Sequence, residues 1–156
     1  MDNQLVNAGA GLQARQQVIS STAFDLVRAG APVEEVKAAL SQDDRAALPL
    51  AIRAIDQDLA LGGPADEAAI ATSLGRQIGL LKAGLAAEHK EDWMACAFGE
   101  LKNLPPDMVM HALRDVRRKA RFEGDVVPMV LEIVDPQVAK LQTERKHVER
   151  LLEIAG

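Results

Sequence analysis

One helix-start signal recurs along this chain and constrains its fold more than any other feature. A proline followed within a few residues by acids opens three stretches, at Pro32, Pro64 and Pro105. Proline is tolerated in the first turn of a helix, and acids there complement the positive end of the helix dipole. Apolar residues follow each signal at spacings of three and four. The pattern predicts an all-α fold, a bundle of short amphipathic helices with a C-terminal helical extension.

The composition agrees with helices and bounds the cellular setting. Aromatic residues make up only 3% of the chain and tyrosine is absent, whereas a β-sandwich needs aromatic and β-branched residues in alternation. The 156 residues suffice for one domain that buries roughly 70% of its unfolded surface. The single cysteine, Cys96, excludes a disulfide framework and is predicted to be a small core residue. With no membrane-length apolar run and no export signal, we expect a soluble, cytoplasmic protein.

The first half is expected to hold three helices. The first covers residues 11–29 and stops at Gly30, in a C-cap position. A short helix starts two residues later. Ser41, with acids behind it, opens the third, whose apolar repeat contains Pro49. Because a proline in a helix interior costs about 3 kcal/mol, this helix either begins near Leu48 or kinks there.

The sequence Leu-Gly-Gly-Pro at 61–64 is the clearest break in the chain. It predicts a boundary between an N-terminal helical segment, 1–61, and a C-terminal helical bundle, 64–156, with a single domain as the alternative. In the helix that follows, Gly75 and Gly79 are four residues apart and are expected to let another helix approach closely. The same stretch lacks a preceding strand and a Gly-Lys-Ser/Thr ending, so it does not match a nucleotide-binding loop.

Helices with apolar faces are expected on both sides of residues 102–124, the most basic stretch of the chain. Residues 88–102 place Trp93 and Phe98 on one apolar side, where they are the large pieces of a core otherwise made of Ala, Leu and Val. Residues 126–134 form a short helix that Asp135 and Pro136 are expected to end. The remaining segment carries apolar residues at heptad spacing, which predicts docking on the parent domain, with self-association as the alternative. These residues are Val138, Leu141, Val148 and Leu152, with Arg145 between them.

A basic cluster interrupts an otherwise acidic chain. Residues 102–124 have a net charge of +3, whereas the whole chain has −5. Residues 105–121 are expected to form a basic helix whose four arginines fall within about 100° of arc, opposite the apolar stripe. Guanidinium groups at this spacing lie roughly 5 to 6 Å apart, which suits successive phosphates or a carboxylate-lined partner. The predicted binding residues are Arg114, Arg117, Arg118, Arg121 and Lys102. The alternative is a solvated face on which Asp115 pairs with Lys119.

No catalytic motif accompanies this cluster. The three histidines, His89, His111 and His147, show no metal-ligand spacing and no partner cysteine, and no G-x-S-x-G sequence occurs. Acidic pairs such as Glu34 and Glu35 are explained by their place in helix first turns. We therefore expect a protein that is not an enzyme, with no cofactor and no metal site.

Part of the chain resembles a known group of proteins. The matching positions are Trp93, Glu100-Leu101, Leu104-Pro105, Val109, Ala112-Leu113, Arg117, Arg121-Phe122, Pro128 and Glu132-Ile133. Over residues 92–133 this succession resembles small helical proteins of phages and prophages, some of which are replication accessory factors of the helicase-loader type. The resemblance implies an accessory role in DNA replication.

The sequence is compatible with two functions. In the first, the chain is a phage-type replication accessory protein whose arginine face contacts DNA or an acidic replication protein such as a replicative helicase. In the second, it is a protein-binding adaptor or inhibitor with no nucleic-acid role, and the arginines grip an acidic patch on the partner. Neither involves a membrane, and self-association through the C-terminal helix is compatible with both.

Overall fold

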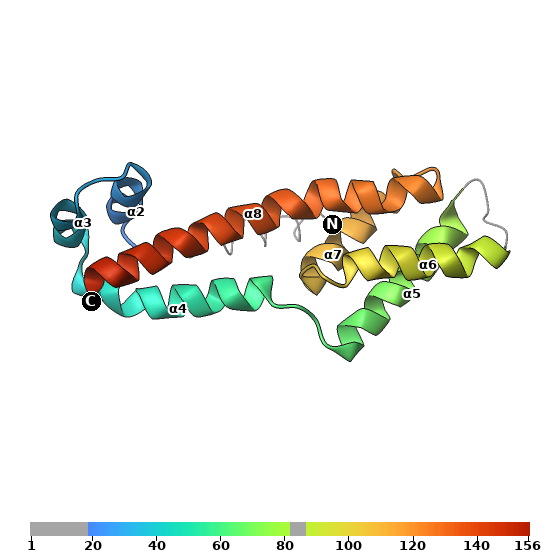
Figure 1. Ribbon diagram of the computed structural model, residues 1–156, viewed down its shortest axis with the longest axis horizontal. Coiled ribbons are helices and arrows are strands. Elements are labelled where there is room, and N and C mark those ends of the chain that lie inside the picture. Colours follow the sequence, from blue (N-terminus) through green and yellow to red (C-terminus); the bar gives the residue numbers. More distant parts are fainter. Residues whose placement is uncertain (1–18, 82–86) are drawn as a thin grey trace. The chain divides into compact units, whose positions relative to one another are not determined.

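The computed structural model describes residues 19–81 and 87–156, and these form seven helices and no strand. The predicted all-α fold is confirmed. The first part of the predicted helix 11–29, up to residue 18, lies outside the described residues. Figure 1 labels the helices as α2 Ser21–Arg28, α3 Val33–Ala39, α4 Gln42–Leu59, α5 Pro64–Leu80, α6 Ala87–Leu101, α7 Pro106–Val116 and α8 Glu123–Ala155.

The chain divides into two compact units. Of the described residues, unit 1 comprises 19–57 and 141–156, and unit 2 comprises 58–81 and 87–140. The division near residue 58 lies close to the predicted boundary at 61–64, but the last sixteen residues group with the N-terminal part rather than with 64–140. Helix α8 contributes residues to both units, because it continues through the point where the sequence predicted a break.

In unit 1, Gly30 reverses the chain between α2 and α3. Its φ of +70° lies in the left-handed region, which glycine adopts without a steric penalty. The N–H of Gly30 donates to the carbonyl of Val27 at 3.1 Å, and the N–H of Ala31 donates to the carbonyl of Leu26 at 2.9 Å. This pair of bonds is the Schellman arrangement, which satisfies carbonyls at a helix end. The predicted C-cap glycine is confirmed.

A reciprocal cap opens α4. The N–H of Asp44 donates to Ser41 Oγ at 3.0 Å, and the N–H of Ser41 donates to Asp44 Oδ2 at 2.8 Å. The Asp44 carboxylate also accepts the Ser41 hydroxyl at 2.7 Å and the N–H of Ser20 at 2.6 Å. Helix α4 then runs through Pro49, so it does not begin near Leu48. The proline is exposed, with its ring on the solvent side, while Leu48 is fully buried.

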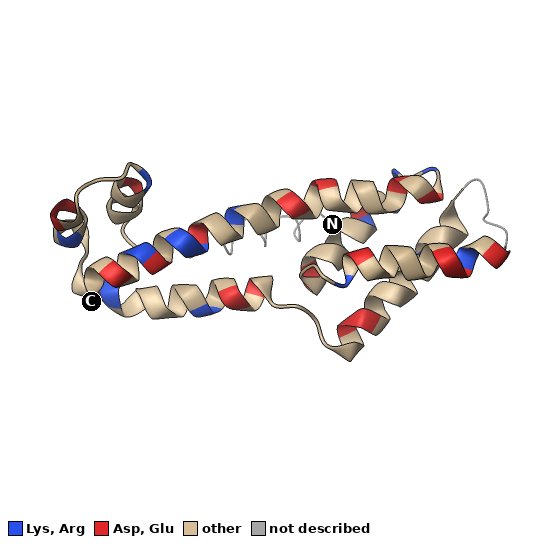
Figure 2. Ribbon diagram, in the orientation of Figure 1, with Lys and Arg blue, Asp and Glu red and all other residues tan. Residues whose placement is uncertain are grey.

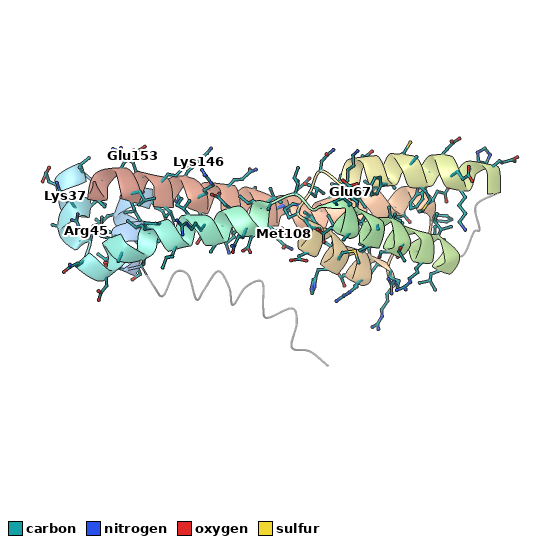
Figure 3. All side chains as sticks on the ribbon, turned by 90° about the horizontal axis from the view of Figure 1, so that it is seen from below. Lys37, Arg45, Glu67, Met108, Lys146 and Glu153 are labelled. Atoms are coloured by element: carbon teal, nitrogen blue, oxygen red, sulfur yellow. The ribbon has the colours of Figure 1, made fainter. Side chains whose placement is uncertain are left out.

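Helix α4 and the C-terminal part of α8 run antiparallel. At one end Arg45 Nη1 donates to the carbonyl of Ala155 at 2.8 Å, and at the other Arg145 Nε donates to Asp56 Oδ1 at 2.6 Å. Figure 3 labels Arg45 and Glu153 at the ends that lie side by side. The heptad residues Leu141 and Val148 are buried in this unit. Docking within the chain therefore covers the side chains that self-association would have used.

Unit 2 is built around one apolar cluster. Helix α5 packs against α6 and α7, and the first part of α8 adds three valines spaced by four residues. The buried members are Ile70, Leu74, Leu81, Ala97, Leu101, Val109, Ala112, Leu113, Val116, Val126, Val130 and Val134. Trp93 and Phe98 pack against the cluster as predicted, although both stay partly exposed. Cys96 is exposed, so its prediction as a core residue is wrong.

The predicted helix break at Asp135 and Pro136 does not occur. Helix α8 spans 33 residues and contains both Pro128 and Pro136 in its interior. Both prolines are exposed, so the carbonyls that lose their hydrogen bonds face solvent. Buried side chains continue on either side of Pro136, with Val134 before it and Leu141 after it. Burial of this continuous stripe offsets the roughly 3 kcal/mol that an interior proline costs.

The glycines of α5 do not serve a close helix contact. Within the described residues, a Cβ added to Gly75 or Gly79 would meet no atom within 4 Å. The expected close approach of another helix at these two positions is therefore wrong. At the start of α5 the situation is different, because a Cβ on Gly62 would come within 2.6 Å of Asp66. Asp66 there accepts the N–H of Gly63 at 3.1 Å and caps the helix.

The open space at Gly75 leads to a stability prediction. Gly75→Ala should raise the unfolding free energy by about 0.5 to 1 kcal/mol, because alanine restricts the unfolded chain and favours helix. The melting temperature should rise by roughly 1 to 4 °C. Gly30→Ala is the matched control and should lower the melting temperature, because alanine is strained at a φ of +70°. A lower melting temperature for Gly75→Ala would show that another part of the chain covers this position.

The Asp44 cap leads to a prediction on pH. Burial raises the pKa of Asp44, but hydrogen bonds from the Ser41 side chain and the Ser20 and Ser41 backbone together outweigh it and lower the pKa below 3.8. The carboxylate therefore stabilises the fold above pH 3.8, and this contribution is lost as the pH falls from there through the lower folded-state pKa. Asp44→Asn should lower the unfolding free energy at pH 7 by about 1.5 to 3 kcal/mol.

Urea unfolding of both proteins at pH 7 and at pH 3 tests this expectation. The difference in unfolding free energy between wild type and Asp44→Asn should be smaller at pH 3 than at pH 7. Asp43→Asn is the control, since Asp43 is exposed in the same first turn and should change stability by less than about 1 kcal/mol. If the difference in unfolding free energy between wild type and Asp44→Asn were the same at both pH values, the charge of Asp44 would not be what stabilises the fold.

Candidate nucleic-acid interface

The predicted basic helix, residues 105–121, is shorter in the structure. Helix α7 ends at Val116, and only Arg114 among the four arginines lies within it. Arg117 is the C-cap residue, Arg118 follows in a turn, and Arg121 lies in the connection to α8. The expected row of four arginines on one helix face is therefore wrong. The cationic residues gather instead around the turn between α7 and α8, which is coloured blue in Figure 2.

The end of α7 follows from where its apolar stripe stops. Val109, Ala112, Leu113 and Val116 are all buried, and three cationic residues come directly after them. The N–H groups of Lys119 and Ala120 both donate to the carbonyl of Val116 at 2.9 Å, which closes one last turn. Beyond Ala120 no side chain before Val126 is fully buried. The chain therefore turns here and enters α8.

We define the basic turn as residues 114–122, which carry five basic residues and one acid. Arg114, Arg118 and Arg121 are exposed, and within the described part of the chain none of them forms an ion pair. Lys119 pairs with Asp115 at 2.9 Å, as the alternative of a solvated face expected. Among the described residues these three exposed arginines therefore have no ion-pair partner, and their guanidinium groups are available to a carboxylate or phosphate.

Arg117 differs from its neighbours. It is half-buried, and its Nε atom is buried without a hydrogen-bond partner. A half-buried arginine of this kind packs the apolar part of its side chain along the protein surface, so less of it is exposed than of its neighbours. The expectation that all four arginines form a solvent-facing row is wrong for this one.

Lys102 does not join the basic turn. It follows the end of α6, whereas Arg117 and Arg118 follow the end of α7. The 11 residues of α7 lie between them and span about 16 Å. The Lys102 ammonium lies over the ring of Phe98 at 5.8 Å, which is a cation–π distance. The structure thus separates Lys102 from the other predicted binding residues.

Two anchors fix the backbone on the far side of the basic turn. One Asp125 oxygen accepts the N–H of Arg121 at 3.2 Å and that of Phe122 at 3.1 Å. Trp93 Nε1 donates to the carbonyl of Glu123 at 3.1 Å, which ties the first residue of α8 to α6. Asp125 thus caps the start of α8 from inside the helix. The turn is held at the end where α8 begins.

Phe122 completes the surface and was not among the predicted binding residues. Its side chain is 56% exposed, directly after Arg121. This exposure could not be predicted from the sequence, because an isolated Phe beside a helix start is equally compatible with a core position. Its neighbours Ala120 and Val127 pack partly against the core of unit 2.

In the described residues, no group of three or more His, Cys, Asp or Glu side chains could hold a metal ion. His89 is exposed, and His111 and His147 are half-buried. No helix of the described part combines the length and the apolar character needed to cross a membrane.

Comparison with protein-family models, curated proteins and solved structures gives no match.

The contrast between Arg117 and Arg118 gives a prediction for the turn. Arg117→Glu should lower the unfolding free energy by about 1 to 3 kcal/mol, because it places a new carboxylate where a polar atom is already buried without a partner. Arg118→Glu should change it by less than about 1 kcal/mol, since that side chain is exposed. Urea unfolding of the two variants provides the measurement. Equal effects would mean that the two side chains share one environment.

Proposed function

We propose that this chain is a non-enzymatic accessory protein that contacts DNA through the basic turn. The observation that supports the proposal is the group of exposed cations, Arg114, Arg118 and Arg121, without ion-pair partners in the described chain. Each guanidinium can meet a phosphate, and phosphate contacts supply most sequence-independent DNA affinity. The resemblance to replication accessory factors over residues 92–133 points to DNA replication as the setting.

A second candidate is an adaptor that binds an acidic protein partner. One observation favours it, because the remainder of the chain is acidic and the net charge of the whole is −5. Such a surface repels a long polyanion at distances within the Debye length, about 8 to 10 Å at physiological salt. A compact acidic patch on a protein would meet the basic turn without approaching the acidic parts of the chain. Helicase and other replication proteins are partners of this kind under the proposal.

Charge reversal of two exposed arginines tests both candidates. The variant Arg118→Glu with Arg121→Glu should keep its helical circular dichroism and its melting temperature nearly unchanged, since exposed charges contribute under about 1 kcal/mol each. Binding to a fluorescent DNA oligonucleotide should weaken by at least about tenfold, because two attractions become repulsions. For the wild type, three phosphate contacts predict a slope of about −3 for the logarithm of affinity against that of salt concentration.

The control variant reverses Lys37 and Arg53, which are exposed cations of unit 1. It carries the same change in net charge and should bind nearly as the wild type does. DNA binding that is equally weakened by both variants would reflect net charge alone and would contradict the site. Absence of DNA binding, together with arginine-dependent binding of a polyglutamate peptide, would favour the adaptor.

A further inference from the structure

The exposed ring of Phe122 is an unusual neighbour for a group of cations. Five large apolar side chains of the described residues are exposed, and the other four, Val33, Leu50, Leu61 and Leu80, are aliphatic. Phe122 is thus the one exposed aromatic ring in this set, and it directly follows Arg121. Water contact over more than half of its surface forgoes much of the free energy that burial of an aromatic side chain supplies.

The exposure of Phe122 is held in place by the local backbone. Its N–H donates to Asp125 Oδ2 at 3.1 Å, and the N–H of Asp125 donates to the Phe122 carbonyl at 3.1 Å. The next residue, Glu123, accepts the indole N–H of Trp93. These bonds fix the main chain on both sides of the ring. A fixed support means that less conformational entropy is lost when a ligand binds there.

Cations lie within a short reach of this ring. Arg118 and Arg121 are four residues and one residue away, so their Cα atoms lie at most about 14 Å and about 4 Å from that of Phe122. Both are exposed, and neither forms an ion pair within the described chain. An aromatic ring flanked by free guanidinium groups is the combination that single-stranded nucleic acids require, with one base stacked on the ring and the adjacent phosphates on the cations.

We propose that the basic turn binds single-stranded nucleic acid, with Phe122 as the stacking platform for an unpaired base. This inference rests on the proposed function and specifies its ligand. Arg118 and Arg121 meet the phosphates on the two sides of the stacked base, and Arg114 extends the cationic track along α7. In a duplex the base faces are already stacked on one another, so the ring would have no face to contact.

The first measurement compares ring variants in fluorescence anisotropy with a labelled oligo(dT). Phe122→Ala should weaken binding by about 5- to 150-fold, the range found for the loss of one aromatic stacking partner. Phe122→Trp should keep or increase affinity, and its added indole emission should be quenched on binding. Phe122→Leu, which keeps apolar area but has no π-face, should resemble Phe122→Ala. Leu50→Ala, at an exposed position on α4 in unit 1, should bind as the wild type does.

Salt dependence separates stacking from charge. Phe122→Ala removes no phosphate contact, so its salt slope should equal that of the wild type, whereas Arg118→Gln should reduce the slope by about 0.7. An oligo(rU) of the same length shows whether the sugar matters, and a duplex of the same length tests the preference for single strands. We expect the single strands to bind more tightly than the duplex.

The measurements distinguish a failure of the stacking inference from a failure of the proposed function. If the arginine reversal weakens nucleic-acid binding but Phe122→Ala does not, the stacking inference is wrong and the proposed function stands. Tighter binding to the duplex than to the single strand would also contradict the stacking inference and leave the proposed function standing. If neither single strands nor duplexes bind, both proposals fail. Phe122-dependent binding of a polyglutamate peptide alone would assign the ring to a protein interface.

Discussion

Burial of one continuous apolar stripe on α8 is the constraint on which the described structure depends. Val126, Val130 and Val134 enter the cluster of unit 2, and Leu141 and Val148 are buried in unit 1. The stripe passes Pro136 without a break, because both interior prolines are exposed and the carbonyls that lose their bonds can face water. Each unit thus obtains part of its core from the same helix, and neither is built from a contiguous stretch of sequence.

The same helix determines where the basic turn lies. Its first residues are tied down by Asp125, which binds the N–H groups of Arg121 and Phe122, and by the indole of Trp93. Helix α7 ends at Val116, before these anchors, so Arg117, Arg118 and Arg121 lie outside a helix. The exposed ring of Phe122 directly follows Arg121.

Charge and burial divide the cationic residues into distinct roles. Arg114, Arg118 and Arg121 are exposed and have no ion-pair partner in the described residues, whereas Lys119 is paired with Asp115 and Arg117 is half-buried. Exposed charges add little to the stability of a fold, so stability does not explain why these three arginines are present. A group of uncompensated cations in an acidic chain is better explained by an anionic ligand, which is the basis of the proposed function.

The sequence by itself determined the fold class, the C-cap at Gly30 and the starts of α3 and α5, because these follow from local signals: apolar spacing, a left-handed glycine, and first-turn prolines and acids. It also located the basic cluster. Only the tertiary structure decided that α8 continues through Pro136, that α7 ends at Val116, and that Phe122 and Cys96 are exposed. Those outcomes depend on which faces are covered by segments distant in sequence, and packing energies of several kcal/mol override local propensities of about 1 to 3 kcal/mol.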